Sequence, residues 1–250
     1  MNLRATYGAT IDQAKETALI TRLNFSGTQD GQTVLRSELP QPFPVSWGDA
    51  NAVGSAATFN VTVTNLSLAG WQTFLGDPTP GGVFDARVEL SAQQNAQEIQ
   101  ITSRGRLAGF VLPPDGSTVG SADLQWQTRA QVKSLNEVNL ENFQFEVLRT
   151  NQQALVTLAA GRLNLETGAA DLQVTVRGAL EKLLPLAGMP DAKLRSGELV
   201  LQSQIVGRGD VQTITGQLAI TNISGAMGDV ALDKFGANLA YDVALRADAV

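Results

Sequence analysis

The side chains that could do chemistry in this 250-residue chain are carboxylates, hydroxyls, amides, lysines and arginines, since the sequence contains no cysteine and no histidine. Their absence excludes disulfides, thiol or imidazole catalysis, iron–sulfur clusters and metal sites built on thiolate or imidazole ligands. Carboxylates remain, but no Asp-x-Asp-x-Asp loop suggests calcium, and nothing in the sequence nominates an acid–base pair. We therefore predict that the protein is not an enzyme and uses no metal and no cofactor.

Short motifs add little to this chemistry. The phosphate-binding patterns GxxxxGK[ST] and GxGxxG do not occur. Lys plus Arg is 18 and Asp plus Glu is 24, which gives a net charge of -6 with scattered basic residues, so we expect no nucleic-acid partner. The adhesion tripeptide at 208–210 is also what a polar hairpin turn produces by chance. Asp12 and Glu16 would share a face if residues 10–18 formed a helix, where a solvated surface pair is the simpler interpretation.

The elements that would position these side chains are mostly β-strands. Apolar and polar residues alternate with a period of two, and the alternating runs are rich in Val and Thr. Because side chains of a strand point to opposite faces in turn, each run has one apolar and one polar face. Short polar turns separate the runs, for example Asp30-Gly31 and 166–168, which favours antiparallel pairing. The clearest runs are 57–64, 86–91, 171–176, 199–202 and 239–246.

Helical signal is sparse and short. Residues 68–75 and 179–187 carry apolar residues at three- and four-residue spacing, and each is predicted to form about two turns. Residues 10–18 are a weaker helix candidate, with Thr10 as the N-cap. The fold class predicted from these patterns is all-β, with two or three short helices.

An internal repeat organises the chain. Residues 55–63 align with 168–176 without a gap, and five of the nine positions are identical. Further landmarks follow in the same order in both copies, so we predict two similar units of roughly 110 residues. The first β-repeat, with its N-terminal lead-in, is assigned to 1–136 and the second to 137–250. The further landmarks are the short helices, 76–78 with 188–190, 86–90 with 197–201, 105–108 with 216–219, and 122–126 with 237–241.

A sheet with one apolar face must cover that face. It can pack as a sandwich, curl on itself, or hold a foreign apolar body against its apolar side. Aromatic residues are only 6% of the chain, and the apolar positions are Val, Leu, Ile and Ala. That composition suits a smooth trough as well as an interdigitated core, whereas a repeat array favours an extended groove.

The second copy carries the pattern G-x-L-x-L, T-G-x-A-x-L-x-V-x-V, a short Leu-rich helix, Pro, and G-x-L-x-L at 161–165, 167–176, 179–187, Pro190 and 197–201. This pattern resembles the repeats of AsmA-like proteins, which are related to the TamB group of bacterial envelope proteins. The resemblance covers about residues 20–250 and is clearest over 140–222. Two features depart from the family: its N-terminal membrane anchor is not in this sequence, and copy one has 82–86 (GVFDA) in place of the glycine–leucine strand.

The resemblance implies a long, curled antiparallel sheet that forms an open groove with an apolar lining. It also implies a periplasmic protein, anchored in the inner membrane through other segments, whose groove conducts phospholipid acyl chains toward the outer membrane. Phospholipid would be its partner. On this hypothesis the groove is lined in copy one by Phe59, Val61, Val63, Val88, Leu90, Leu124 and Trp126, and in copy two by Leu172, Val174, Val176, Leu199, Leu201, Leu239 and Tyr241.

Two alternatives stay open on the sequence. Each inward Val or Leu could be ordinary core rather than a lipid contact. The whole chain could also be a structural or adhesive cell-surface β-repeat with a closed, dry core. The two interpretations differ in whether the apolar face is open.

Overall fold

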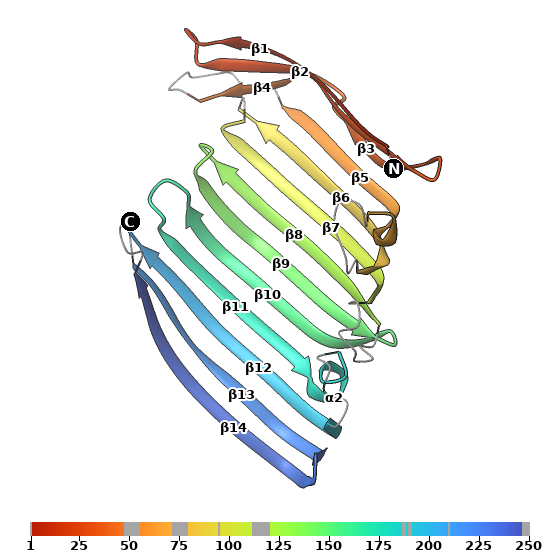
Figure 1. Cartoon of the computed structure of the whole chain (residues 1–250). Helices are drawn as coiled ribbons and strands as arrows, with labels where there is room; N and C mark the ends of the chain where they lie inside the picture. Colours follow the sequence, from red (N-terminus) through yellow and green to blue (C-terminus); the bar gives the residue numbers. More distant parts are fainter. Residues whose placement is uncertain are drawn as a thin grey trace.

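The computed structural model describes residues 2–47, 56–71, 80–94, 96–111, 121–186, 189, 192–209 and 211–246. Together they form one open antiparallel sheet of 14 strands, which confirms the predicted all-β class (Figure 1). The strands are β1 (Asn2–Asp12), β2 (Thr17–Gln29), β3 (Gln32–Glu38), β4 (Phe43–Ser46), β5 (Ala57–Ser67), β6 (Gly81–Gln93), β7 (Glu98–Val111), β8 (Ala122–Lys133), β9 (Glu137–Arg149), β10 (Gln152–Asn164), β11 (Ala170–Ala179), β12 (Ala192–Arg208), β13 (Val211–Met227) and β14 (Val230–Arg246).

The topology is a meander. From β5 to β14, every strand pairs with its neighbours in the sequence, and the strands lie side by side along the molecule (Figure 1). The order departs from this only near the N-terminus, where β3 pairs with β5 and the short β4 pairs back onto β2. Each predicted alternating run lies inside one of these strands, as expected for segments whose two faces differ in polarity.

The turns carry the residues that tight turns require. Asp30 and Gly31 connect β2 to β3 with φ of 52° and 76°, in the left-handed region that Asp and Gly tolerate best. Gly168 (φ 67°) lies in the predicted turn between β10 and β11. The turn expected at 113–116 lies outside the described residues.

Both predicted helical segments contain helix in the described residues. The described part of 68–75 forms the 3-10 helix η1 (Leu68–Trp71), and residues 72–75 lie outside the described residues. Within 179–186 the helix α2 (Leu180–Leu183) is shorter than the predicted two turns. The prediction of a helix over 10–18 was wrong, because Asp12 ends β1 and Thr17 begins β2. Hairpin pairing of the two strands outweighs the weak local helix signal, and Asp12 forms its ion pair with Lys15 at 3.2 Å rather than sharing a helix face with Glu16.

The two predicted copies correspond to successive groups of strands. The strand landmarks of copy one lie on β5, β6, β7 and β8, and those of copy two lie on β11, β12, β13 and β14. The landmark 76–78, and 188–190 except for Met189, lie outside the described residues. A short helix follows β5 and another follows β11. The register corrects the later landmarks, because the row of Val63 continues with Ala86, Gly105 and Trp126, whereas the row of Val176 continues with Leu201, Leu218 and Leu239. By register, Ala86 is therefore equivalent to Leu201 rather than to Gly197, and Trp126 is equivalent to Leu239 rather than to Tyr241.

The proposed division of the chain at 136/137 falls in the turn between β8 and β9. The ladder between these two strands is continuous from Lys133 with Glu137 to Asp123 with Leu148, interrupted only by a bulge near Arg129. The two sequence units therefore share one uninterrupted sheet.

Candidate functional site

The pairing register places every predicted groove residue on one face of the sheet, here called the apolar face. Directly opposed residues of an antiparallel pair share a face. Phe59 opposes Leu90 and Val61 opposes Val88, and the same rule connects each further strand. One complete row across the sheet is Val63, Ala86, Gly105, Trp126, Phe145, Thr157, Val176, Leu201, Leu218 and Leu239.

The same register collects the remaining predicted residues in parallel rows. Leu172, Val174 and Val176 lie on β11, and Val176 faces Leu201. Tyr241 on β14 faces Gly216, which in turn faces Ser203. The rows of Leu124 and Leu199 belong to the same face, since Leu124 faces Leu107 and Leu199 faces Gly178.

The apolar face is not packed under a second layer of the described residues. Large apolar side chains on it are mostly half-buried, and Phe59 is unusual in being only 8% exposed. On the last strand, Leu239 is 58% exposed. The buried hydrophobic residues are largely alanines, so no interdigitated core forms within the described residues. The sheet is open, unlike the closed core of the structural alternative.

The helix α2 covers one end of this face. An added Cβ on Gly178 would lie 2.6 Å from Leu183 Cδ1, and one on Gly197 would lie 3.2 Å from Leu180. The helix therefore rests directly on the backbone of β11 and β12. The rows toward the other end of these strands remain uncovered by α2.

Trp126 crosses its neighbouring strand over a glycine. An added Cβ on Gly105 would lie only 2.2 Å from the indole ring, so the ring occupies the space above that glycine. Beyond it, the ring stacks on Phe84 of β6 with a centroid distance of 5.5 Å and an interplanar angle of 24°. The indole Nε1–H donates to Ser103 Oγ at 3.2 Å. The ring therefore lies flat on the sheet, and its polar atom has a partner.

Tyr241 repeats this arrangement in copy two. An added Cβ on Gly216 would lie 2.6 Å from Tyr241 Cζ. The phenol ring passes over β13, and its hydroxyl forms a hydrogen bond with the Ser203 hydroxyl of β12. The register does not place the two aromatic residues at equivalent positions, but each ring covers a glycine of the preceding strand. The serine partners differ, since Ser103 lies on the same strand as Gly105 and Ser203 lies one strand beyond Gly216. Both rings lie flat instead of projecting as a wall.

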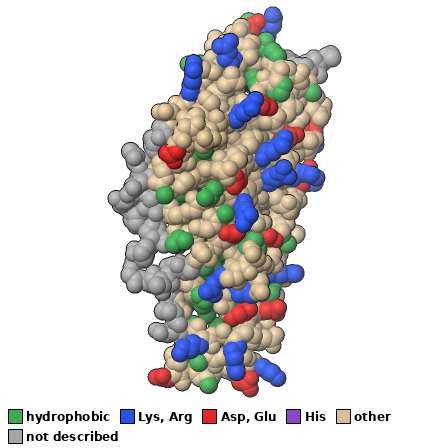
Figure 2. Space-filling model, turned by 90° about the vertical axis from the view of Figure 1, so that its right-hand side faces the viewer, with side chains coloured by type: hydrophobic (Ala, Val, Ile, Leu, Met, Phe, Trp, Pro, Cys, Tyr) green, Lys and Arg blue, Asp and Glu red, His purple; other side chains and the backbone are tan. Residues whose placement is uncertain are grey.

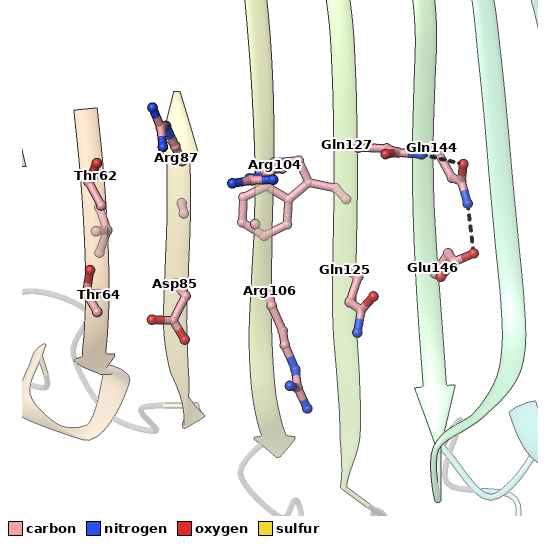
Figure 3. A pocket seen from close by; sticks show the side chains of 14 residues that line it. Thr62, Thr64, Asp85, Arg87, Arg104, Arg106, Gln125, Gln127, Gln144 and Glu146 are labelled. Atoms are coloured by element: carbon pink, nitrogen blue, oxygen red, sulfur yellow. Dashed lines mark hydrogen bonds between the residues drawn. The ribbon is translucent and has the colours of Figure 1, made fainter. Parts of the chain in front are cut away.

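The opposite, polar face contains an open cavity of about 650 Å³ over β5 to β9 (Figure 3). Its side chains come from alternate positions of five neighbouring strands, and the intervening apolar residues contribute mainly backbone. Figure 2 shows how basic and acidic side chains mix along the molecule. The polar side chains that line the cavity are Thr62, Thr64, Asp85, Arg87, Arg104, Arg106, Gln125, Gln127, Gln144 and Glu146.

Hydrogen bonds fix one wall of this cavity. Gln127 Nε2–H donates to Gln144 Oε1 at 2.8 Å, and Gln144 Nε2–H donates to Glu146 Oε1 at 2.8 Å (Figure 3). Gln153 also donates to Glu146 Oε1, at 2.9 Å. On another side of the cavity, Asp85 Oδ1 accepts a hydrogen bond from the backbone N–H of Asn65 at 2.8 Å. Both carboxylates of the cavity therefore already have neutral donors.

Arg106 of β7 is held by a carboxylate at the start of β8. Asp123 forms an ion pair with Arg106 and accepts the backbone N–H of Gly109 at 2.8 Å. The Gly109 N–H, followed by the Arg106 guanidinium, lowers the pKa of Asp123 below its usual value of 3.8. The carboxylate is thus ionised at neutral pH and restrains the arginine.

A second open cavity of about 650 Å³ also lies on the polar face, toward the other strand ends of β8 to β12. Its charged residues alternate in sign across the strands. They are Lys133, Glu137, Arg162, Asp171 and Arg208. Both cavities were missed from the sequence, because their charged residues come together only through the register of neighbouring strands.

Comparison with known proteins gives no relative: no protein-family model, no curated protein and no solved structure matches the chain. Within the described ranges, no group of three or more carboxylates is arranged to hold a metal ion. The helices of the described part are all too short to span a bilayer.

Proposed function

We propose that this chain is a non-enzymatic segment of an AsmA-like envelope protein. On this proposal its apolar face binds phospholipid acyl chains and conducts them between the inner and outer membranes, in the periplasm. The observation that supports it most is the continuity of the apolar face, whose rows run from β5 to β14 and which the described residues leave largely uncovered. The open edge of the sheet lets the headgroup stay in water.

Acyl chains would bind this face weakly and evenly. A fully buried methylene contributes about 0.8 kcal/mol, and one that rests on a single face contributes roughly half of that. Ten methylenes on the sheet would therefore contribute about 4 kcal/mol. Since Val, Leu and Ala recur along each row, neighbouring positions of a chain would differ little in free energy, and this favours sliding over trapping. The rings of Trp126 and Tyr241 rest over Gly105 and Gly216, so each occupies space close to the backbone of the sheet.

The proposal is tested with lipid retained by the purified protein. Val61 and Val174 lie on the apolar face at equivalent positions of the two copies, and both are half-buried. We expect Val61→Asn with Val174→Asn to lower the phospholipid co-purified from bacteria at least several-fold, as measured by native mass spectrometry.

The matched control changes the opposite face of the same strands. Thr58→Asn with Thr175→Asn should leave bound lipid unchanged, because these positions point away from the apolar face. Circular dichroism checks that all variants keep the fold. Equal lipid in both double variants, or no lipid on the wild-type protein, would contradict the proposal and favour a structural or adhesive role.

A further inference from the structure

Two arginines face each other directly on the polar face. Arg87 of β6 and Arg104 of β7 occupy opposed positions in the antiparallel ladder, and both line the first cavity (Figure 3). Like charges directly opposite each other on a sheet are unfavourable. The arrangement is notable in a chain whose net charge is -6.

The second copy lacks this repulsion. The equivalence of Thr62 with Thr175 follows from the ungapped repeat, and each threonine begins the same row of the ladder. In copy one the row continues with Arg87 and Arg104. In copy two it continues with Gln202 and Gln217. The sheet therefore accepts uncharged amides at these positions, and the arginines are a feature of copy one alone.

No nearby carboxylate holds the pair in a close ion pair. Among the described residues, Asp85 and Glu146 accept hydrogen bonds from neutral donors and form no ion pair with Arg87 or Arg104, and Asp123 pairs with Arg106. Glu89 reaches Arg87 only at 3.8 Å, between two side chains that are each about half exposed, where an ion pair contributes little. Arg104 forms no ion pair with any described residue.

We propose that the Arg87–Arg104 pair is a binding site for a phosphate group, on the face opposite the proposed lipid path. The planar guanidinium fork matches phosphate oxygens, and two forks from adjacent strands present donors to one dianion. Arg106, restrained by Asp123, adds a third positive charge at the border of the cavity. The cavity of about 650 Å³ leaves room for a polar molecule that carries the phosphate, next to the amides of Gln125 and Gln127.

Copy two shows which substitutions test the site, because it has glutamine at both equivalent positions. Arg87→Gln and Arg104→Gln convert the row of copy one into that of copy two. We expect each single variant to weaken binding of inorganic phosphate at least tenfold in isothermal titration calorimetry at constant ionic strength, and the double variant to abolish it. Arg129→Gln is the control, since Arg129 lies on the same face opposite Thr102 and Asn142. It should change the affinity less than twofold.

A stability measurement separates binding from a structural role. Without phosphate, the double variant should unfold at the same temperature as the wild-type protein or higher, because a repulsion is removed. Phosphate should raise the unfolding temperature of the wild-type protein and leave that of the double variant unchanged. A double variant that unfolds earlier and still responds to phosphate would overturn the proposal.

Vesicles identify the source of the phosphate. If the wild-type protein sediments with phosphatidylglycerol vesicles and the double variant does not, the site is assigned to a lipid headgroup. Binding of inorganic phosphate without vesicle binding assigns it to a small phosphorylated molecule. If neither phosphate nor vesicles bind, or if the arginine variants bind both as well as the wild-type protein does, the proposal is wrong. The apolar-face variant pair at Val61 and Val174 should keep phosphate binding, so this result is independent of the lipid proposal.

Discussion

Replacing Gly105 with alanine should have opposite effects on stability in two backgrounds. In the wild-type protein the new methyl would lie 2.2 Å from the ring of Trp126. The ring must then move, and its stacking on Phe84 and its hydrogen bond to Ser103 are both perturbed. We expect Gly105→Ala to lower the free energy of unfolding by about 1–3 kcal/mol, the usual cost of overpacking.

The same substitution should stabilise the protein when the ring is absent. The three atoms nearest to the added methyl all belong to Trp126. Trp126→Ala alone should cost about 2–3 kcal/mol, somewhat less than for a fully buried tryptophan, because the side chain is only half-buried. On top of it, Gly105→Ala should restore about 0.5–1 kcal/mol, since glycine disfavours a strand interior.

Urea denaturation followed by circular dichroism measures all four proteins of this double-mutant cycle. The predicted coupling between the two sites is about 1.5–4 kcal/mol. Additive effects within about 0.5 kcal/mol would show that the ring does not rest on Gly105 and would refute the reasoning. Gly81→Ala is a suitable control, because its added methyl has its nearest neighbour at 3.8 Å.

Three further changes have defined outcomes. Gly161→Ala should lower the free energy of unfolding, measured by urea denaturation, by at least about 2 kcal/mol, because Gly161 has φ of 147° and its added Cβ would lie 2.1 Å from the Asp171 carbonyl oxygen. Gly81→Ala should change it little. Ser203→Ala should lower the free energy of unfolding by about 1 kcal/mol, because the hydrogen bond to Tyr241 is lost, and Tyr241→Phe should lower it by a similar amount in the same assay. A much larger decrease in either variant would contradict a single shared hydrogen bond. The folded pKa of Asp123 is below 3.8, so its contribution to stability is present above pH 3.8 and is lost as the pH falls through the folded value. Thermal unfolding between pH 2 and 5 should therefore depend less steeply on pH in Asp123→Asn than in the wild-type protein, and an unchanged profile would exclude this role.

The apolar face could be predicted from the sequence because a strand has a period of exactly two. Once Phe59, Val61 and Val63 alternate with polar residues, their common face follows from backbone geometry alone. The repeat then extends the inference to Leu172, Val174 and Val176. The packing of Trp126 on Gly105 and of Tyr241 on Gly216 could not be predicted, because only the register between neighbouring strands brings each ring over its glycine.

The polar cavity could not be predicted in the same way. Arg87 and Arg104 are 17 positions apart, and only the register makes them opposed residues. A shift of one residue would send either side chain to the other face. Bulges change the register within several ladders, for example after Gly8 and after Arg129, and a single sequence does not locate them. The hairpin at residues 10–18 was missed because the local helix signal is outweighed by a strand ladder that begins at Asp12 with Thr17 and extends beyond this window to Asn2 with Thr28.

The meander order has a consequence for how the protein folds and opens. From β5 onward each strand finds its partner immediately before or after it in the chain, so contacts are short in sequence and hairpins can form independently. The sheet should therefore grow by adding strands one at a time, as repeat proteins do, and should fray from β1 and β14, which each have one paired neighbour. Amide hydrogen exchange should then be slowest near β8 to β10 and become faster toward both edges.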